Sequence, residues 1–195
     1  MNNQHDIINL PKTILLIFGL PGSGKTTLSE KIQKLLPPET SIYFNADKVR
    51  STLSKDLGFS IDDRIEQARR MACMASLALD GSSARVCIVD FVNPNIDTWT
   101  AFRTNLNRPT GRPRVSDINR VPAVVSSETT FPLFSVFMNT IQKDGCRFAD
   151  TAELFDRNER PVDLSFNDFL LDPEMDKAAD RVVADMMHKS IGRTK

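Results

Sequence analysis

GLPGSGKT, at residues 19–26, directly follows the apolar run TILLIF at residues 13–18. It matches the pattern G-x-x-x-x-G-K-[ST], whose glycines let successive backbone N–H groups point into one concavity that fits a phosphate chain. The apolar run predicts a β-strand before the motif, and the residues after the motif predict a helix. This placement is the context that confirms a phosphate-binding loop. The sequence therefore predicts a nucleotide-binding α/β protein, and a glycine-rich turn that only serves packing is the alternative.

The loop assigns separate roles to two of its side chains. Lys25 is expected to reach the β- and γ-phosphates of ATP, and the hydroxyl of Thr26 is the predicted ligand of Mg²⁺. ATP and Mg²⁺ are accordingly the expected cofactors. The predicted nucleotide-binding residues are Gly19, Leu20, Pro21, Gly22, Ser23, Gly24, Lys25, Thr26 and Thr27.

Composition narrows the class of protein. A chain of 195 residues with 41% hydrophobic content predicts a single domain over residues 1–195. The 25 Lys and Arg residues balance the 25 Asp and Glu residues, which favours a small-molecule partner over nucleic acid or a membrane surface. No apolar run approaches a membrane span and residues 1–6 lack the order of a signal peptide, so we expect a cytoplasmic protein. Its oligomeric state stays open between a monomer and a homodimer.

The three cysteines carry no expected function. Cys73, Cys87 and Cys146 are widely spaced and do not match the spacing of metal ligands. The sequence therefore predicts neither a disulfide framework nor a zinc site.

Strands and helices alternate along the rest of the chain. Apolar runs predict strands at residues 13–18, 41–44, 85–89, 132–138 and 162–166. Helical periodicity predicts helices at residues 25–36, 47–53, 60–80, 97–106, 148–155 and 173–191, with Ser60 or Asp62 as the N-cap of the longest. This alternation predicts an α/β fold, with a parallel sheet of about five strands flanked by helices. Residues 107–130 contain three prolines and four arginines and are predicted to form an inserted loop.

Further motifs follow the second predicted strand. NADKVR stands at residues 45–50, KDLGFS at residues 55–60 and DRIEQARR at residues 63–70. Together with residues 19–27, these motifs resemble the adenylylsulfate kinase family. The resemblance covers about the first hundred residues and implies a P-loop kinase fold and an ATP-dependent kinase with a nucleotide acceptor.

The resemblance implies roles for four residues in acceptor binding. The equivalent of Asp47 faces the acceptor hydroxyl, where a carboxylate can orient it toward the γ-phosphate of ATP. The equivalents of Arg50 and Arg64 hold the anionic acceptor nucleotide, and the equivalent of Phe59 stacks on its adenine. Each residue also has a plainer interpretation: Asp47 as a helix N-cap, the two arginines as solvated surface charges, and Phe59 as a core aromatic.

The chain departs from the family pattern in three respects. Gln67 stands where the family has Asn, and Asn93 stands where the family has a Ser before the Pro; both are predicted to contact the acceptor. The basic lid that closes over the acceptor sulfate in the family is not found. We expect Arg147 to close over the phosphates instead, because it follows the strand that ends beside the phosphate-binding loop. The alternative closing residues are Lys143, Arg157 and Arg160.

These observations predict an ATP-dependent phosphotransferase that acts on a hydroxyl of a small anionic nucleotide, most simply adenylylsulfate. Lys25, Asp47 and Arg147 are its predicted catalytic residues. One alternative is a polynucleotide kinase or another small-molecule P-loop kinase, because residues 45–50 and 89–94 loosely resemble that group. A non-catalytic, nucleotide-dependent binding module is the alternative of a different class.

Overall fold

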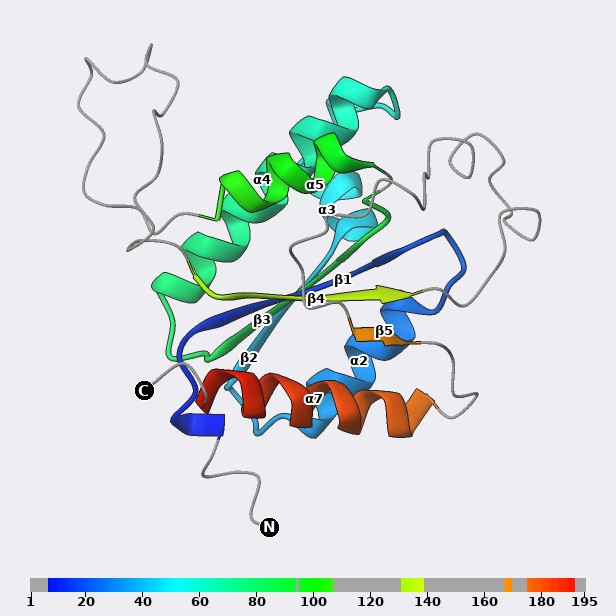
Figure 1. The fold of residues 1–195 in the computed structure, drawn as a ribbon. Coiled ribbons are helices and arrows are strands. Elements are labelled where there is room, and N and C mark those ends of the chain that lie inside the picture. The colour runs from blue at the N-terminus through cyan, green and yellow to red at the C-terminus, as the bar shows by residue number, and fades with distance from the viewer. Residues whose placement is uncertain (1–6, 94, 107–130, 139–166, 170–174, 192–195) are drawn as a thin grey trace.

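A parallel β-sheet lies at the centre of the computed structural model (Figure 1). The structure describes residues 7–93, 95–106, 131–138, 167–169 and 175–191. The strands stand in the order β2-β3-β1-β4-β5, and all four neighbouring pairs are parallel. Four strands have five to seven residues, and β5 is a three-residue strand at one edge. Their bounds are β1 Thr13–Gly19, β2 Ser41–Asn45, β3 Val86–Phe91, β4 Leu133–Met138 and β5 Asn167–Phe169.

Helices cover both faces of this sheet. α4 and α5 pack on one face, and α2 and α7 pack on the other (Figure 1). The described helices are α2 Lys25–Leu35, α3 Ala46–Thr52, α4 Ile61–Asp80, α5 Ile96–Thr104 and α7 Met175–Ile191. The predicted parallel sheet of about five strands, flanked by helices, is thereby confirmed.

The central strands are apolar on both sides because both sides face helices. Every residue of β1 is buried, and its side chains alternate between the two cores. Leu16 and Phe18 pack toward α4 and α5, whereas Leu15 and Ile17 pack toward α2 and α7. A strand covered in this way appears in sequence as a continuous apolar run, which is why residues 13–18 and 85–89 were recognisable.

Helix α4 begins with a complete capping box. The Ser60 hydroxyl accepts a hydrogen bond from the Asp63 N–H at 3.2 Å, and Asp63 accepts one from the Ser60 N–H at 3.3 Å. Of the two N-cap candidates in the sequence, Ser60 is therefore the cap, and Asp62 lies in the first turn. This cap sets where the chain enters α4 after the segment that carries Phe59.

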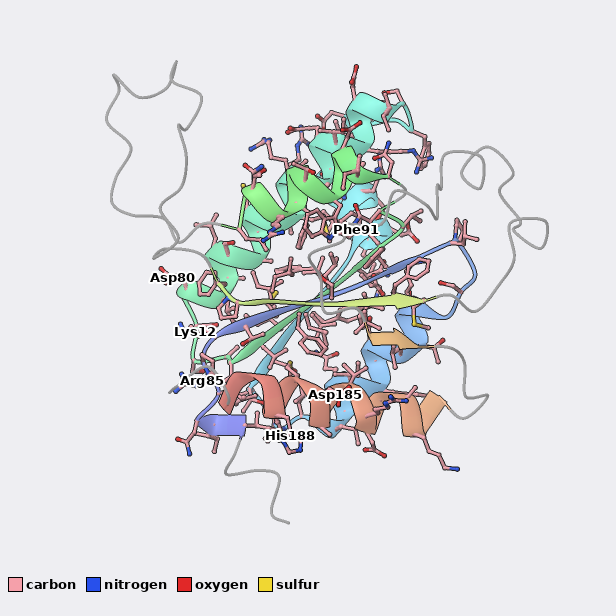
Figure 2. All side chains as sticks on the ribbon, in the orientation of Figure 1. Lys12, Asp80, Arg85, Phe91, Asp185 and His188 are labelled. Carbon is pink, nitrogen blue, oxygen red and sulfur yellow. The ribbon has the colours of Figure 1, made fainter. Side chains whose placement is uncertain are left out.

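The other end of α4 is held by a lysine from the segment before β1. The Lys12 ammonium donates hydrogen bonds to the carbonyl oxygens of Leu79, Asp80 and Ser82 at 2.7, 3.0 and 2.9 Å. Figure 2 labels Lys12 and Asp80 at this end of the molecule. The last carbonyls of a helix have no partner within the helix, and a cation there also opposes the negative end of the helix dipole.

Replacing Lys12 with Met is expected to lower the free energy of unfolding by about 2 kcal/mol, since hydrogen bonds from a charged group are lost. Met retains most of the apolar stem, so the change isolates the ammonium. Urea unfolding measures the effect. Lys55→Met, which removes an exposed ammonium from the segment before α4, is the matched control and should leave the midpoint in place. Equal midpoints for Lys12→Met and the control would contradict this account of α4.

Three predicted segments lie outside the described residues. They are the inserted loop at 107–130, the helix at 148–155 and the strand at 162–166. The described strand β5 stands directly after the last of these, at Asn167–Phe169. In the part of the chain that the structure describes, no helix is both long and apolar enough to span a bilayer.

Candidate functional site

The phosphate-binding loop connects the end of β1 to the start of α2. Gly24 is the N-cap residue of α2 and has left-handed backbone angles, with φ 85° and ψ 14°. Among the described residues no side chain caps the helix, and its first turn contains no acidic residue. The N–H groups at the start of α2 therefore keep the positive end of the helix dipole available to an anion. This is the local geometry that phosphate binding requires.

Lys25 folds back across this loop. Its ammonium donates hydrogen bonds to the carbonyl oxygens of Gly19 at 3.0 Å and Leu20 at 2.8 Å. The positive charge is therefore held over the turn between strand and helix. From this position the lysine can exchange backbone carbonyls for the oxygens of a phosphate chain.

Gly19 brings the loop close to the end of β4. Its φ is +154°, and a Cβ at this position would lie 2.6 Å from the carbonyl oxygen of Met138. Gly19 and Met138 are also register partners in the β1–β4 pair. β4 therefore ends beside the phosphate-binding loop. Arg147, the predicted closing residue in the chain after β4, lies outside the described residues.

Asp90 is a site residue that the sequence analysis did not assign. It stands next to the end of β3, is 1% exposed, and pairs in register with Ile17 of β1 and Asn45 of β2. Its carboxylate accepts hydrogen bonds from Tyr43 at 2.6 Å, Asn45 at 2.8 Å and Ser29 at 3.3 Å. An acidic residue that ends a buried apolar strand was the signal available in the sequence.

The buried carboxylate is electrostatically linked to the phosphate-binding loop. Burial raises the pKa of Asp90, while hydrogen bonds from Tyr43, Thr26 and Asn45 and the charge of Lys25 oppose that shift. A buried charge is costly to retain unless it is hydrogen-bonded and has a partner. Two of these partners, Lys25 and Thr26, belong to the motif of the phosphate-binding loop. Asp90 therefore lies in the part of the site that would bind the phosphate donor, which we call the donor half.

The oxygen atoms of Thr26 and Asp90 are suited to bind a hard cation. Thr26 offers a hydroxyl oxygen and Asp90 a carboxylate, the oxygen ligands that Mg²⁺ prefers. No group of three or more His, Cys, Asp or Glu side chains among the described residues could hold a metal ion. Mg²⁺ usually takes several of its ligands from substrate phosphates and water.

Asp47 lies in the first turn of α3 and is exposed. The N-cap of α3 is Asn45, whose side chain accepts a hydrogen bond from the Lys48 N–H at 3.0 Å. The interpretation of Asp47 as a helix N-cap is therefore wrong. No described residue donates a hydrogen bond to its carboxylate, which leaves both oxygens available at the edge of the sheet where the phosphate-binding loop lies.

Arg50, Phe59 and Arg64 are brought together beyond α3. The two guanidinium carbons lie 4.9 and 5.6 Å from the centre of the Phe59 ring, and Phe59 is 68% exposed. Phe59 is therefore not a core aromatic. Its exposed position and two flanking cations are suited to a planar anionic ligand.

The two arginines also shape the segment that carries Phe59. Arg50 donates hydrogen bonds to the carbonyl oxygens of Leu57 at 3.4 Å and of Gly58, and Arg64 donates to that of Phe59 at 2.9 Å. Burial lowers the pKa of Arg50, and the charges of nearby acidic residues oppose this shift. Burial also lowers the pKa of Arg64, and the charge of Arg50 adds to this shift. These are partly buried, engaged cations rather than solvated surface charges.

Gln67 and Asn93 are buried, at 2% and 4% exposure. The Gln67 amide nitrogen donates to the Ala46 carbonyl at 3.5 Å, next to Asp47. Asn93 follows the end of β3 with a left-handed φ of 48°. Each side chain has a buried amide oxygen with no hydrogen-bond partner among the described residues. A buried acceptor in this state is costly, which makes both oxygens candidate sites for a ligand's donor group.

Comparisons with known proteins show which family the chain resembles. A sequence model described as adenylylsulphate kinase matches residues 11–111. An adenylyl-sulfate kinase of Oceanobacillus iheyensis is 38% identical over 95 residues, which are 48% of this chain and 46% of that protein. In eight curated relatives, the matched part covers at most 50% of the relative's length.

Solved structures share the fold at lower identity. An APS kinase of Mycobacterium tuberculosis, solved with AMPPNP and APS, superposes with a TM-score of 0.63 at 24% identity, covering 91% of this chain and 99% of that one. A gluconokinase of Sinorhizobium meliloti superposes with a TM-score of 0.56 at 13% identity, covering 94% of this chain and 98% of that one. The fold is thus common to kinases named for different acceptors, so it does not identify the acceptor.

Proposed function

Because the chain belongs to the adenylylsulphate kinase family, we propose that it transfers the γ-phosphate of ATP to a hydroxyl of a small anionic nucleotide, with adenylylsulfate as the first acceptor to test. The observation that carries this proposal is that the exposed carboxylate of Asp47 and the phosphate-binding loop stand at the same edge of the sheet. A further part of the proposal is a cytoplasmic location, where ATP is available as donor.

The donor half would bind the triphosphate of ATP. The N–H groups at the start of α2 and the ammonium of Lys25 would contact the phosphate oxygens, as their geometry allows. Thr26 and Asp90 would hold Mg²⁺ through their hydroxyl and carboxylate oxygens. When bound, that cation would neutralise charge on the β- and γ-phosphates.

The acceptor half would present a hydroxyl to the γ-phosphorus. The acceptor oxygen forms a bond to that phosphorus, the bond to the β–γ bridging oxygen breaks, and ADP leaves. Asp47 orients the hydroxyl and accepts its proton. Lys25 and, from outside the described residues, Arg147 would stabilise the charge on the transferring group.

The pocket around Phe59 would select the acceptor. A base can stack on the exposed Phe59 ring, while Arg50 and Arg64 offer charged donors to its phosphate or sulfate. The amide oxygens of Gln67 and Asn93, which have no hydrogen-bond partner in the described part of the chain, would accept hydrogen bonds from the acceptor's amino or hydroxyl groups.

Replacing Tyr43 with Phe tests the proposed role of Asp90 in holding Mg²⁺. The change removes one hydroxyl donor from the Asp90 carboxylate. We expect the Mg²⁺ concentration for half-maximal binding of a fluorescent ATP analogue to rise about tenfold, the usual effect of losing a residue that orients a metal ligand. Thr13→Val, which removes a buried hydroxyl bonded to the Pro11 carbonyl at the opposite end of β1, is the control. Equal Mg²⁺ dependence in both variants would contradict the role assigned to Asp90.

The proposed reaction is tested by transfer from ATP labelled at the γ-phosphate. Adenylylsulfate should accept the label, and AMP, which lacks the sulfate, should accept it poorly. Gluconate and a 5′-hydroxyl oligonucleotide represent the other acceptor classes. If either of these two is labelled faster than adenylylsulfate, that compound replaces adenylylsulfate as the proposed acceptor. Tight ATP binding without labelling of any acceptor would instead indicate a nucleotide-dependent binding module.

A further inference from the structure

Asn45 connects the donor half of the site with the helix that carries Asp47. It is the last residue of β2, is 9% exposed, and is also the N-cap of α3. Its amide nitrogen donates to the Asp90 carboxylate at 2.8 Å and to the Thr26 hydroxyl at 3.2 Å. Its amide oxygen accepts the hydrogen bond from the Lys48 N–H at 3.0 Å.

These contacts determine which way the amide faces. An ionised carboxylate has no hydrogen to donate and can only accept hydrogen bonds. The amide nitrogen of Asn45 must therefore face Asp90. The Lys48 N–H can only donate, so the oxygen of Asn45 must face α3. The amide nitrogen of Asn45 thus faces Asp90 and Thr26 in the donor half of the site. Its carbonyl oxygen faces α3, the helix that carries Asp47.

Capping alone does not explain this residue. Asp, Ser and Asn cap helices about equally well, because each offers an oxygen to the backbone N–H groups. Of these three, only Asn also carries two N–H donors that reach Asp90 and Thr26. Asp would place a second carboxylate directly beside Asp90, its register partner.

The Thr26 hydroxyl shows how the connection acts on the donor half. A hydroxyl has one hydrogen and two lone pairs. The Asn45 amide nitrogen donates to the Thr26 oxygen at 3.2 Å and so occupies one lone pair. The second lone pair is left for a cation. Asn45 therefore orients the hydroxyl for a metal and positions α3 with the same group.

We propose that Asn45 is a positioning residue that couples the occupancy of the donor site to the ordering of α3, and thereby places Asp47 relative to the γ-phosphate. This inference rests on the proposed function, since it takes the donor site to bind Mg²⁺ and ATP. Coupling of this kind is reciprocal: a ligand at Thr26 favours the position of α3 that the amide holds.

Hydrogen exchange with and without Mg²⁺ and AMPPNP tests the coupling with no acceptor present. In the wild-type protein, the ligand should slow exchange at residues 20–28, and at residues 48–52 of α3 by about fivefold or more. In Asn45→Asp and Asn45→Ser, the slowing at residues 48–52 should fall to about twofold or less while that at residues 20–28 persists. Both variants keep a capping oxygen, and the Ser variant adds no charge beside Asp90.

Thr52→Val is the matched control for α3 itself. It removes the hydroxyl that donates to the Lys48 and Val49 carbonyls without touching the donor site. Its ligand-dependent slowing at residues 48–52 should equal that of the wild type. Undiminished slowing in both Asn45 variants would overturn the inference while leaving the proposed function in place. Absence of slowing at residues 20–28 in the wild type would overturn the proposed function and the inference together.

Discussion

Lys25→Met is expected to reduce phosphoryl transfer about a thousandfold, the upper range for removing one charged group that stabilises a transition state. The lysine already lies over the phosphate-binding loop, bonded to the carbonyls of Gly19 and Leu20. Met preserves most of its length, so the loss reports the ammonium. The affinity for ATP should fall as well, because the same charge contacts the phosphates before transfer.

The experiment compares transfer rates and ATP affinity with those of Lys34→Met. Lys34 is an exposed lysine in the last turn of the same helix, α2, and its replacement should leave both quantities near the wild-type values. Transfer by Lys25→Met within about tenfold of the wild-type rate would show that the loop's lysine does not act on the transferring phosphate.

Asp47→Asn is expected to reduce transfer by about two to four orders of magnitude, the range for a positioned acid–base group, while ATP affinity stays the same. Asn keeps the size of the side chain but cannot accept the hydroxyl proton. Because Asn45 and not Asp47 caps α3, the substitution leaves the helix start intact. A loss of transfer with unchanged ATP affinity is the result that distinguishes a kinase from a binding module.

Asp62→Asn is the matched control for this change. Asp62 also lies exposed in the first turn of a helix, α4, so both substitutions remove an equivalent interaction with a helix dipole. Single-turnover transfer and equilibrium nucleotide binding should both be measured. A parallel loss of activity in the two variants would point to the helix dipole rather than to the chemistry of Asp47.

Prediction from sequence succeeded where the deciding residues are neighbours in the chain. The motif at residues 19–26 and the apolar runs at residues 13–18 and 85–89 predicted the fold, which the structure confirms. The resemblance to the family, based on residues 19–27 and 45–70, is confirmed by the match over residues 11–111. Each of these patterns is local, because hydrophobic periodicity and turn chemistry act over a few residues.

The surroundings of the acceptor residues were less accessible from the sequence. The sequence pattern allowed Phe59 to be either an exposed ring or a core residue, since an aromatic side chain serves either purpose. Its exposure and its two flanking guanidinium groups follow from how α3, the loop after it and α4 meet. The same holds for Gln67, whose burial beside Ala46 depends on the packing of α4 against α3.

The sequence by itself determined the phosphate-binding loop, because a strand, a glycine turn and a helix start follow one another directly in the chain. Only the tertiary structure decided that Tyr43, Asn45 and Asp90 join Thr26 in one hydrogen-bonded group. These residues come from β2, β3 and α2, and parallel crossovers bring their ends to one edge of the sheet. Which of their donors and acceptors are paired depends on distances across that edge, which no local pattern in the chain encodes.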